Sequence, residues 1–409
     1  GSRRNRGTGT ATEGVAAEFF AGMGLVRRAL EAPSARGRRW RTDFANDLDP
    51  LKSRLYRAYF PGAADHYHEG DIHALSAADL PEADLWTASF PCTDLSLAGR
   101  GAGIHAGQSG AVWGLLRLLE SIDLEKRPSH LLFENVLGLL SSHGGADLRA
   151  LVSAVNDLGF GVDPVCVNAA HFVPQSRPRL FLIATRLDLA LVERADVDSI
   201  EPATARPARI IAAMGRESDL IWHARQTPPL PSPRHALADI LESLDPEDER
   251  WWPAPRAKYF FEQIHPEHRL LAQRMIDRDR VTAAAAFRRV RPVGEMGADG
   301  LRAKRSVIEL RSDGIAGCLR TPKGGSAKQM LFQAGRGEYQ VRFLTALEAA
   351  RLQGLDGVPE GFSENELLFG LGDAVCVPAV RWVLDLLSTP APAAGQPRLF
   401  ASASPVEAV

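Results

Sequence analysis

Four side chains in three short segments have the types and settings that covalent and acid–base chemistry requires. Cys92 follows Pro91, which fixes the backbone before the thiol. Glu134 ends the apolar run HLLF, where partial burial would raise its pKa and let it donate a proton. Arg177 and Arg179 stand two residues apart and would share one face of a strand. A nucleophilic Cys92 would need such cationic neighbours, because a free thiol has a pKa of about 8.5.

Each of these residues also has an ordinary structural explanation. Proline–cysteine is a common pair, and Glu–Asn at the end of a strand can simply cap the next helix.

The glycine- and serine-rich segment 93–107 could close as a lid over a bound substrate. The four cysteines are too widely spaced for a CxxC pair or a zinc ribbon, so neither a disulfide nor a metal site is expected. Cys166 and Cys376 lie in apolar sequences and are expected to fill the core.

A second group of residues predicts a nucleoside pocket. FFAGMGLVRRAL places Gly22 and Gly24 between a strand and a helix, where a ligand can approach the backbone, although a plain tight turn would look the same. Asp47 follows the next strand, where a carboxylate can accept both ribose hydroxyls. Asp71 follows the third strand and could accept an adenine amino hydrogen. A triphosphate is not expected, because the Walker lysine motif is missing.

The elements that must position these residues alternate along the first 190 residues. Strands are expected in VAAEFFAG, RWRTDFAND, DHYHEGDI, ADLWTASF, HLLFENV, FGVDPVCVNAA and RLFLIAT, and helices in RLYRAYF, VWGLLRLLESI and LRALVSAVNDLG. This alternation predicts a parallel, doubly wound α/β sheet with ligands at the carboxyl ends of its strands.

The chain of 409 residues suits two domains. We expect a disordered N-terminus at 1–12, a catalytic domain at 13–186, an inserted lobe at 187–341, a C-terminal part at 342–388 that rejoins the catalytic domain, and a flexible tail at 389–409. No apolar run approaches the roughly 20 residues of a membrane span, and the N-terminal residues have no hydrophobic leader. A cytoplasmic protein is the expectation.

Charge is unevenly distributed along the chain. Residues 250–345 contain 19 lysine and arginine residues against 9 aspartate and glutamate residues, whereas the whole chain has a net charge of −2. A basic segment on a mildly acidic protein indicates a polyanionic partner. A solvated arginine-rich surface is the alternative.

Taken in order, six motifs resemble the motif set of the bacterial cytosine-C5 DNA methyltransferases. They are FAGMG (20–24), PCTDLS (91–96), ENV (134–136), QSRPR (175–179), RFLTALEAARLQG (342–354) and GDAVCVP (372–378). The resemblance implies a Rossmann-like class I fold that uses S-adenosyl-L-methionine, with an inserted target recognition domain. The long motif at 342–354 is expected to be a helix that organises this lobe.

The resemblance also implies a mechanism. Cys92 would add to C6 of a cytosine flipped out of the duplex, and Glu134 would bind and protonate N3. Arg177 and Arg179 would hold the base or a phosphate near the thiolate. C5 would then accept the methyl group, and loss of its proton would release the enzyme. Extrusion of the base costs a few kcal/mol.

Further contacts are implied by position. The cofactor residues would be Phe20, Gly22, Gly24, Asp47, Leu48, Asp71, Ile72, Pro91, Asp373 and Val375. The DNA-binding residues would be Ser96, Arg100, Arg320, Thr321, Lys323, Gly324 and Gly325. In LRTPKGGSAKQ the glycines would let the backbone approach a phosphate while cations neutralise it, although an exposed hairpin would look similar.

Three positions depart from the family pattern. Asp373 stands where the family has asparagine, Phe172 stands where it usually has glycine, and an arginine is replaced around Ser109. An aspartate would disfavour a cofactor that carries an extra carboxylate, because like charges repel.

The favoured function is a DNA (cytosine-5-)-methyltransferase in restriction–modification or phage defence, or acting alone. The alternatives are the tRNA-methylating branch of the superfamily, whose Cys-Phe-Thr signature is not seen, and a sequence-specific DNA-binding protein that has lost catalysis.

We expect a monomer that is bound to the nucleoid through duplex DNA and has restriction or defence proteins as partners. Gln396–Phe400 resembles peptides that dock on the bacterial sliding clamp, but a chance apolar pair or docking on the protein's own surface is the favoured explanation.

Overall fold

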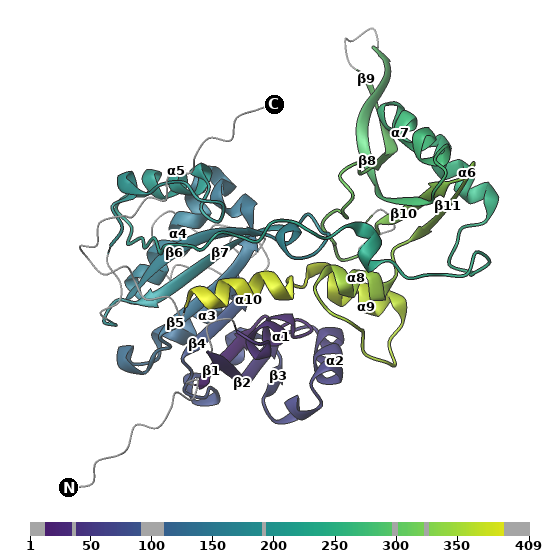
Figure 1. The fold of residues 1–409 in the computed structure, drawn as a ribbon. Helices are drawn as coiled ribbons and strands as arrows, with labels where there is room; N and C mark the ends of the chain where they lie inside the picture. The colour runs from purple at the N-terminus through teal and green to yellow at the C-terminus, as the bar shows by residue number, and fades with distance from the viewer. Residues whose placement is uncertain are drawn as a thin grey trace.

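The computed structural model describes residues 13–34, 38–90, 110–189, 194–296, 302–322 and 327–387. These residues form a large α/β body and a smaller lobe (Figure 1). Several predicted site residues lie outside the described residues, as does the segment 396–400. They are Pro91, Cys92, Ser96, Arg100, Lys323, Gly324 and Gly325.

The body is built on a seven-stranded sheet with the order β3-β2-β1-β4-β5-β7-β6. Its strands are β1 (Glu13–Phe19), β2 (Arg39–Asp47), β3 (Tyr67–Glu69), β4 (Leu85–Ser89), β5 (His130–Val136), β6 (Phe160–Asn168) and β7 (Pro178–Arg186). The first five strands are parallel, but β7 runs antiparallel to both β5 and β6. The expectation of a wholly parallel sheet is therefore wrong at β7. The connection 169–177 is too short for the crossover that parallel neighbours need.

Helices cover both faces of this sheet, as a doubly wound fold requires (Figure 1). They are α1 (Leu25–Glu31), α2 (Pro50–Tyr59), α3 (Ala111–Glu120), α4 (Ala146–Asp157), α5 (Ala208–Arg216) and α10 (Val377–Leu386). The helices α8 (Ala346–Leu352) and α9 (Glu364–Asp373) pack on each other beside α2, on the side toward the lobe (Figure 1). Alternating residues of each strand enter two separate cores. Ala16 and Leu132 pack in the core that contains α1 and α10, whereas Ala17 and Leu131 pack in the core that contains α3, α4 and α5.

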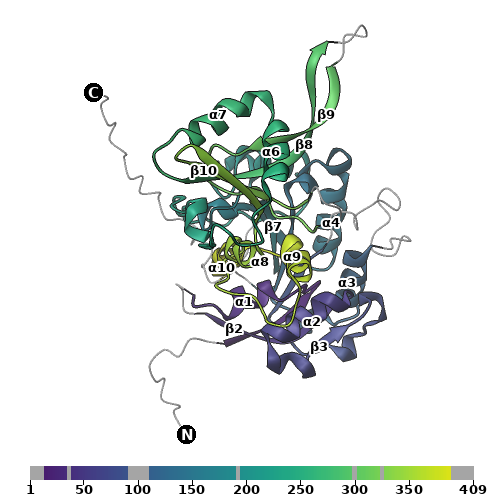
Figure 2. The ribbon, with the colours of Figure 1, turned by 90° about the vertical axis from the view of Figure 1, so that its right-hand side faces the viewer.

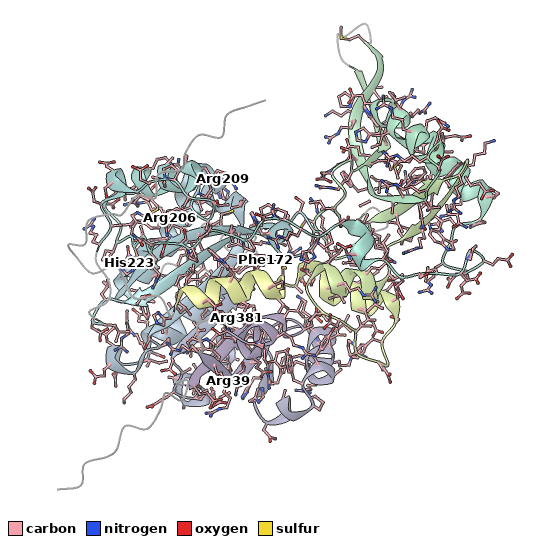
Figure 3. The ribbon with its side chains drawn as sticks, viewed as in Figure 1. Arg39, Phe172, Arg206, Arg209, His223 and Arg381 are labelled. Atoms are coloured by element: carbon pink, nitrogen blue, oxygen red, sulfur yellow. The ribbon has the colours of Figure 1, made fainter. Side chains whose placement is uncertain are left out.

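The last two helices belong to the body, although they come from the far end of the chain. The segment Glu364–Leu386 is long and apolar enough to cross a membrane by length and composition, but 67% of its most apolar window is buried inside the protein. Arg381, labelled in Figure 3, donates from Nη1 to the carbonyl oxygen of Ala29 in α1 at 3.1 Å. A buried arginine that caps a neighbouring helix in this way is typical of a core helix in a folded domain.

The segment 194–225 also packs on the body, along the edge strand β6. The backbone N–H of Val162 donates to the carbonyl oxygen of Ile221 at 3.0 Å. Asp163 is fully buried and accepts hydrogen bonds from Arg206 at 2.6 Å and from Arg225 at 3.1 Å. Figure 3 shows Arg206 at this end of the body, away from the lobe. The first part of the expected 187–341 unit thus lies with the body.

The turn that carries Phe172 explains one departure from the family pattern. Phe172 has a φ of −125°, which any L-residue adopts, so the position does not require glycine. Its side chain is half-buried against the core that contains α10 (Figure 3). An aromatic residue here therefore extends the core without straining the turn.

The lobe contains a four-stranded antiparallel sheet with the order β11-β10-β8-β9. Its elements are β8 (Thr282–Met296), β9 (Arg302–Leu310), β10 (Met330–Gly335), β11 (Glu338–Phe343), α6 (Ala254–Glu262) and α7 (Pro266–Ile276). Only the residues 282–286 of β8 pair with β10. The rest of β8 pairs with β9 alone, so residues 287–296 and 302–309 form a two-stranded ribbon that projects from the lobe (Figure 2). This pair of segments is called the ribbon below.

Glu18 is a buried carboxyl group in the middle of β1. Its side chain accepts a hydrogen bond from the Tyr56 hydroxyl at 3.1 Å and is 1% exposed as a residue. Burial raises the pKa of Glu18 to about 8, although the Tyr56 bond and the charge of Arg27 oppose this. Glu18 is therefore protonated in the folded protein near neutral pH.

Replacing Glu18 with glutamine should remove a pH-dependent loss of stability. The folded carboxyl group keeps its proton up to about pH 8, whereas the unfolded chain releases it near pH 4.5. Between these values the wild type should lose up to about 1.4 kcal/mol of unfolding free energy per pH unit from this group, because folding must take up a proton. Urea unfolding at pH 5 and pH 8 would test this. The stability of Glu18→Gln relative to the wild type should rise with pH, and parallel pH profiles would contradict the assignment.

Candidate active site

One cavity of about 800 Å³ gathers residues from almost the whole length of the chain. It opens where β1, β2, β4 and β5 end and where β7 begins, because the reversed direction of β7 brings its first residues to the same edge. Thirteen of the predicted site residues line it. They are Phe20, Gly22, Asp47, Leu48, Asp71, Ile72, Glu134, Arg177, Arg179, Arg320, Thr321, Asp373 and Val375.

The turn after β1 is held against the end of β2. The N–H of Gly22 donates to the Asp47 carboxylate at 2.8 Å, and Phe20 and Gly22 both have positive φ angles. Gly24 does not line the cavity. A Cβ atom on Gly24 would lie 2.5 Å from the Phe60 ring, so this glycine is needed for packing between α1 and the end of α2. The two predicted glycines therefore have different roles.

One half of the cavity combines carboxylates with apolar surface. Asp47 is buried and holds two backbone N–H groups, those of Gly22 and Asp49, while Asp71 accepts the N–H of His73. Leu48 is 68% exposed and leaves apolar surface open at the cavity wall. Acceptors beside an exposed apolar surface suit a ligand with hydroxyl and amino groups on one side and a flat ring on the other.

The other half of the cavity contains a buried carboxyl group beside an arginine. Val136 of β5 pairs with Arg179 of β7, so the two strands place Arg179 Nε 3.0 Å from Glu134 Oε1. Burial raises the pKa of Glu134 above its ordinary value, although the charges of Arg179 and Arg177 and a hydrogen bond from Ser89 oppose this. A carboxyl group with a raised pKa keeps its proton at a higher pH than an exposed glutamate and can donate it to a bound substrate.

Arg177 has a different environment from Arg179. It precedes β7 and is 2% exposed, and its guanidinium donates to the carbonyl oxygens of Leu319 at 3.0 Å and Ala374 at 2.6 Å. It therefore ties the start of β7 to two segments that are distant in sequence, one between β9 and β10 and one after α9. Gly372 fits this junction, because a Cβ atom there would lie 2.3 Å from the Thr321 backbone nitrogen.

The sequence reasoning missed several residues of the cavity wall. Cys318 lies 3.2 Å from Arg177 Nη1 and 3.6 Å from Arg179 Nη2. Burial alone would raise the pKa of this thiol, but Arg177, Arg179 and Arg320 outweigh it and lower the pKa. Lys52 of α2 forms an ion pair with Asp373. No local pattern marks either residue, since each depends on a partner from another part of the chain.

Asn135 holds Phe90, the residue that follows β4 and lies two residues before Cys92 in sequence. Its side-chain nitrogen donates to the Phe90 carbonyl oxygen at 3.1 Å, and its oxygen accepts the N–H of Val136 at 2.8 Å. Asn135 and Phe90 both line the cavity. The asparagine of the ENV motif therefore has a positioning role between β5 and β4.

Among the described residues no group of three or more histidine, cysteine, aspartate or glutamate side chains is arranged to hold a metal ion. Cys166 and Cys376 are buried in the core, as expected.

The sheet order and the cavity at the strand ends define a Rossmann-like methyltransferase fold. The structure is similar to that of the Dnmt2 methyltransferase of S. pombe, with a TM-score of 0.54 and 15% identity over 92% of this chain and 98% of that one. It is also similar to the Entamoeba histolytica methyltransferase EhMeth, with a TM-score of 0.53 and 13% identity over 92% and 98%. These likenesses concern the fold alone and confirm the predicted fold class.

The model of the C-5 cytosine-specific DNA methylase family matches residues 15–388, and the chain belongs to this family. The resemblance inferred from the six motifs is thus confirmed. Among its relatives, Type II methyltransferase M2.BsuMI of Bacillus subtilis strain 168 is 36% identical over 168 residues, which is 41% of each chain. M.MspI of Moraxella sp is 29% identical over 41% of this chain and 37% of its own. M.HhaI of Haemophilus parahaemolyticus is 28% identical over 42% and 49%. The matched segments span less than half of these relatives.

Proposed function

We propose that the protein is a DNA cytosine-C5 methyltransferase that moves the methyl group of S-adenosyl-L-methionine to C5 of a cytosine flipped out of duplex DNA. The observation that carries the proposal is a single cavity with two chemically different halves. Asp47 and Asp71 line the side of the cavity at β2 and β3, and we assign them to a nucleoside. Glu134 and Arg179 line the side at β5 and β7, and we assign Glu134 to proton donation. A methyl donor and its acceptor base must meet in one space, and this cavity provides it.

The residues of the first half fit the cofactor. Asp47 would accept the ribose hydroxyls, and Asp71 would accept the adenine amino group. Leu48, Ile72 and Phe20 would contact the ring. When bound, the cofactor would supply an electrophilic methyl group on a positively charged sulfur.

The residues of the second half fit a cytosine. The Cys92 thiolate would form a bond to C6 as the C5–C6 double bond opens, and Glu134 would give its proton to N3, so that negative charge does not accumulate on the ring. Arg179, held 3.0 Å from Glu134, would face the same edge of the base. After methyl transfer a base removes the C5 proton, the bond from sulfur to C6 breaks, and Glu134 recovers its proton.

The lobe offers a basic surface for the DNA duplex. Ala283 and Ala285 of β8 pack against the body's core, and Phe287, Arg289 and Arg291 continue on the same side of the strand. Arg305 pairs opposite Arg291, so the ribbon presents three arginines on that side. Glu309, near the base of the ribbon, lies 2.5 Å from Arg291 and 4.0 Å from Arg289, so one carboxylate is shared by two of the three arginines. Figures 1 and 2 show the ribbon extending from the lobe, with its tip pointing away from the body. A two-stranded ribbon fits the major groove, and its arginines fit the phosphates.

Removing these three charges should weaken DNA binding and its salt dependence. Each arginine that contacts a phosphate adds about 1 to the slope of log affinity against log salt concentration. The triple variant Arg289→Gln/Arg291→Gln/Arg305→Gln should therefore lower that slope by about 2 to 3 in fluorescence-anisotropy titrations. The matched control removes three cations from the helical side of the lobe, in Lys258→Gln/Arg274→Gln/Arg278→Gln. Equal losses in the two triple variants would show that the ribbon has no special role.

The direct test of the proposed function is labelled methyl transfer by the full chain to unmethylated duplex DNA and, in parallel, to tRNA. Transfer to DNA, with bisulfite sequencing that locates the methyl group on cytosine, is the expected result. Transfer to tRNA alone would replace the proposal with the tRNA-methylating function. DNA binding without transfer to either substrate would leave a DNA-binding protein that has lost catalysis.

The finer expectations about the protein's setting stay predictions. Several relatives are named as Type II methyltransferases, which supports a role in restriction–modification or phage defence. Duplex DNA is the proposed partner, and the protein is proposed to be a cytoplasmic monomer. Docking of Gln396–Phe400 on a sliding clamp also stays a prediction, and it concerns residues outside the described part of the chain.

A further inference from the structure

The wall of the cavity contains an ion pair that joins two distant helices. Lys52 Nζ of α2 lies 2.6 Å from Asp373 Oδ2 at the last residue of α9, and both side chains line the cavity. Lys52 is largely covered, with 17% of its side chain exposed, whereas Asp373 has 46% exposed. The negative group of the pair is therefore accessible from solvent, and the positive group is held inside.

The charges around the pair keep Lys52 cationic. Burial would lower the pKa of Lys52, but Asp373, Asp47 and Asp49 outweigh it and raise the pKa. Asp47 also accepts the N–H of Gly22, so the pair lies beside the glycine turn and next to the carboxylate assigned to the ribose. A ligand whose ribose is held by Asp47 would therefore extend toward both members of the pair.

We propose that Lys52 and Asp373 together recognise the amino-acid end of the cofactor, with Lys52 binding the α-carboxylate and Asp373 binding the α-ammonium group. The inference rests on the proposed function and adds Lys52 to its cofactor site. In the free protein the two side chains neutralise each other, so neither charge is left unpaired. A zwitterionic ligand replaces this one ion pair with two and leaves the net charge unchanged.

This pairing also accounts for the aspartate at position 373. The family usually has a neutral asparagine there, and a lone aspartate would repel a carboxylate. With Lys52 opposite, the position instead gains a cation for the carboxylate and an anion for the ammonium group. The selectivity should therefore be for ligands that carry both charges.

A purely structural role for the pair can be separated from ligand binding, because the same helices share a second ion pair. Arg54 of α2 lies 2.6 Å from Glu366 of α9, and neither residue lines the cavity. Arg54→Met breaks this link between α2 and α9 outside the site. It is the matched control for Lys52→Met.

The experiment is isothermal titration of the full chain with three ligands, namely S-adenosylmethionine, S-adenosylhomocysteine and 5′-methylthioadenosine. The last has no amino acid group. Lys52→Met and Asp373→Asn should weaken the first two ligands about 10-fold to 100-fold and leave methylthioadenosine within about 3-fold of the wild type. Arg54→Met should leave all three affinities unchanged, and Lys52→Arg, which retains the charge, should keep most of the preference if Lys52→Met does not fold.

Other outcomes would overturn specific claims. Equal weakening of all three ligands would show that the pair only links α2 to α9. Unchanged affinities would show that it has no part in binding. If the wild type binds neither S-adenosylmethionine nor S-adenosylhomocysteine, the proposed function itself fails, and this result is distinct from a failure in the variants alone.

Discussion

Glutamine in place of Glu134 should lower the rate of methyl transfer about 10²-fold to 10⁴-fold, the usual contribution of a positioned general acid. The amide occupies the same volume but cannot give a proton to N3 of the base. Affinity for S-adenosylhomocysteine should stay within about 3-fold of the wild type, because Glu134 belongs to the opposite half of the cavity from Asp47 and Asp71. Single-turnover rates with saturating DNA and a titration with S-adenosylhomocysteine would measure the two effects separately.

The pH dependence gives an independent check of the same assignment. Burial raises the pKa of Glu134, so its protonated form persists at a higher pH than for an exposed glutamate. The ratio of wild-type rate to Glu134→Gln rate should be largest at low pH and should fall as pH rises through that pKa. A ratio that does not fall as the pH rises, or a variant that retains more than about a tenth of the wild-type rate, would contradict the proton-donating role.

The parts of the site that sequence could predict are those with a local pattern. Gly22 and Asp71 follow β1 and β3 within a few residues, whereas Asp47 and Glu134 lie at the carboxyl ends of β2 and β5. The carboxyl end of a parallel strand is a place where ligands bind. Because these strands end at a common edge of the sheet, their terminal residues lie close together. The sheet and the cavity wall therefore follow from short-range signals in the sequence.

The parts that sequence could not predict depend on contacts between distant segments. Lys52 and Asp373 are 321 residues apart, and Arg177 and Cys318 are 141 apart. The direction of β7 decides whether Arg179 reaches Glu134. The spacing of Arg177 and Arg179 predicts one shared strand face, but Arg177 lies before β7 and its guanidinium is held by carbonyl oxygens. The short 169–177 connection was the one available signal for the reversed strand.

Substitution of Cys92 by serine should abolish turnover, with a loss of at least about 10³-fold, because a hydroxyl is far less nucleophilic than a thiolate near neutral pH. Affinity for S-adenosylhomocysteine should change little, since the proposed cofactor contacts are Asp47, Asp71 and their neighbours. Mass spectrometry after reaction with an oligonucleotide that contains 5-fluorocytosine should find the adduct at position 92 in the wild type and none in Cys92→Ser.

The structure supplies a demanding control for this experiment, because a second thiol lines the same cavity. Cys318 contacts Arg177 and Arg179, and its pKa is lowered by these arginines together with Arg320 against the effect of burial. It is therefore a chemically reasonable rival for the nucleophile. Cys318→Ser should still form the adduct at position 92 and should retain turnover. An adduct that maps to Cys318, or near-normal turnover in Cys92→Ser, would transfer the nucleophilic role to the other thiol and would place the reacting carbon beside β7 rather than after β4.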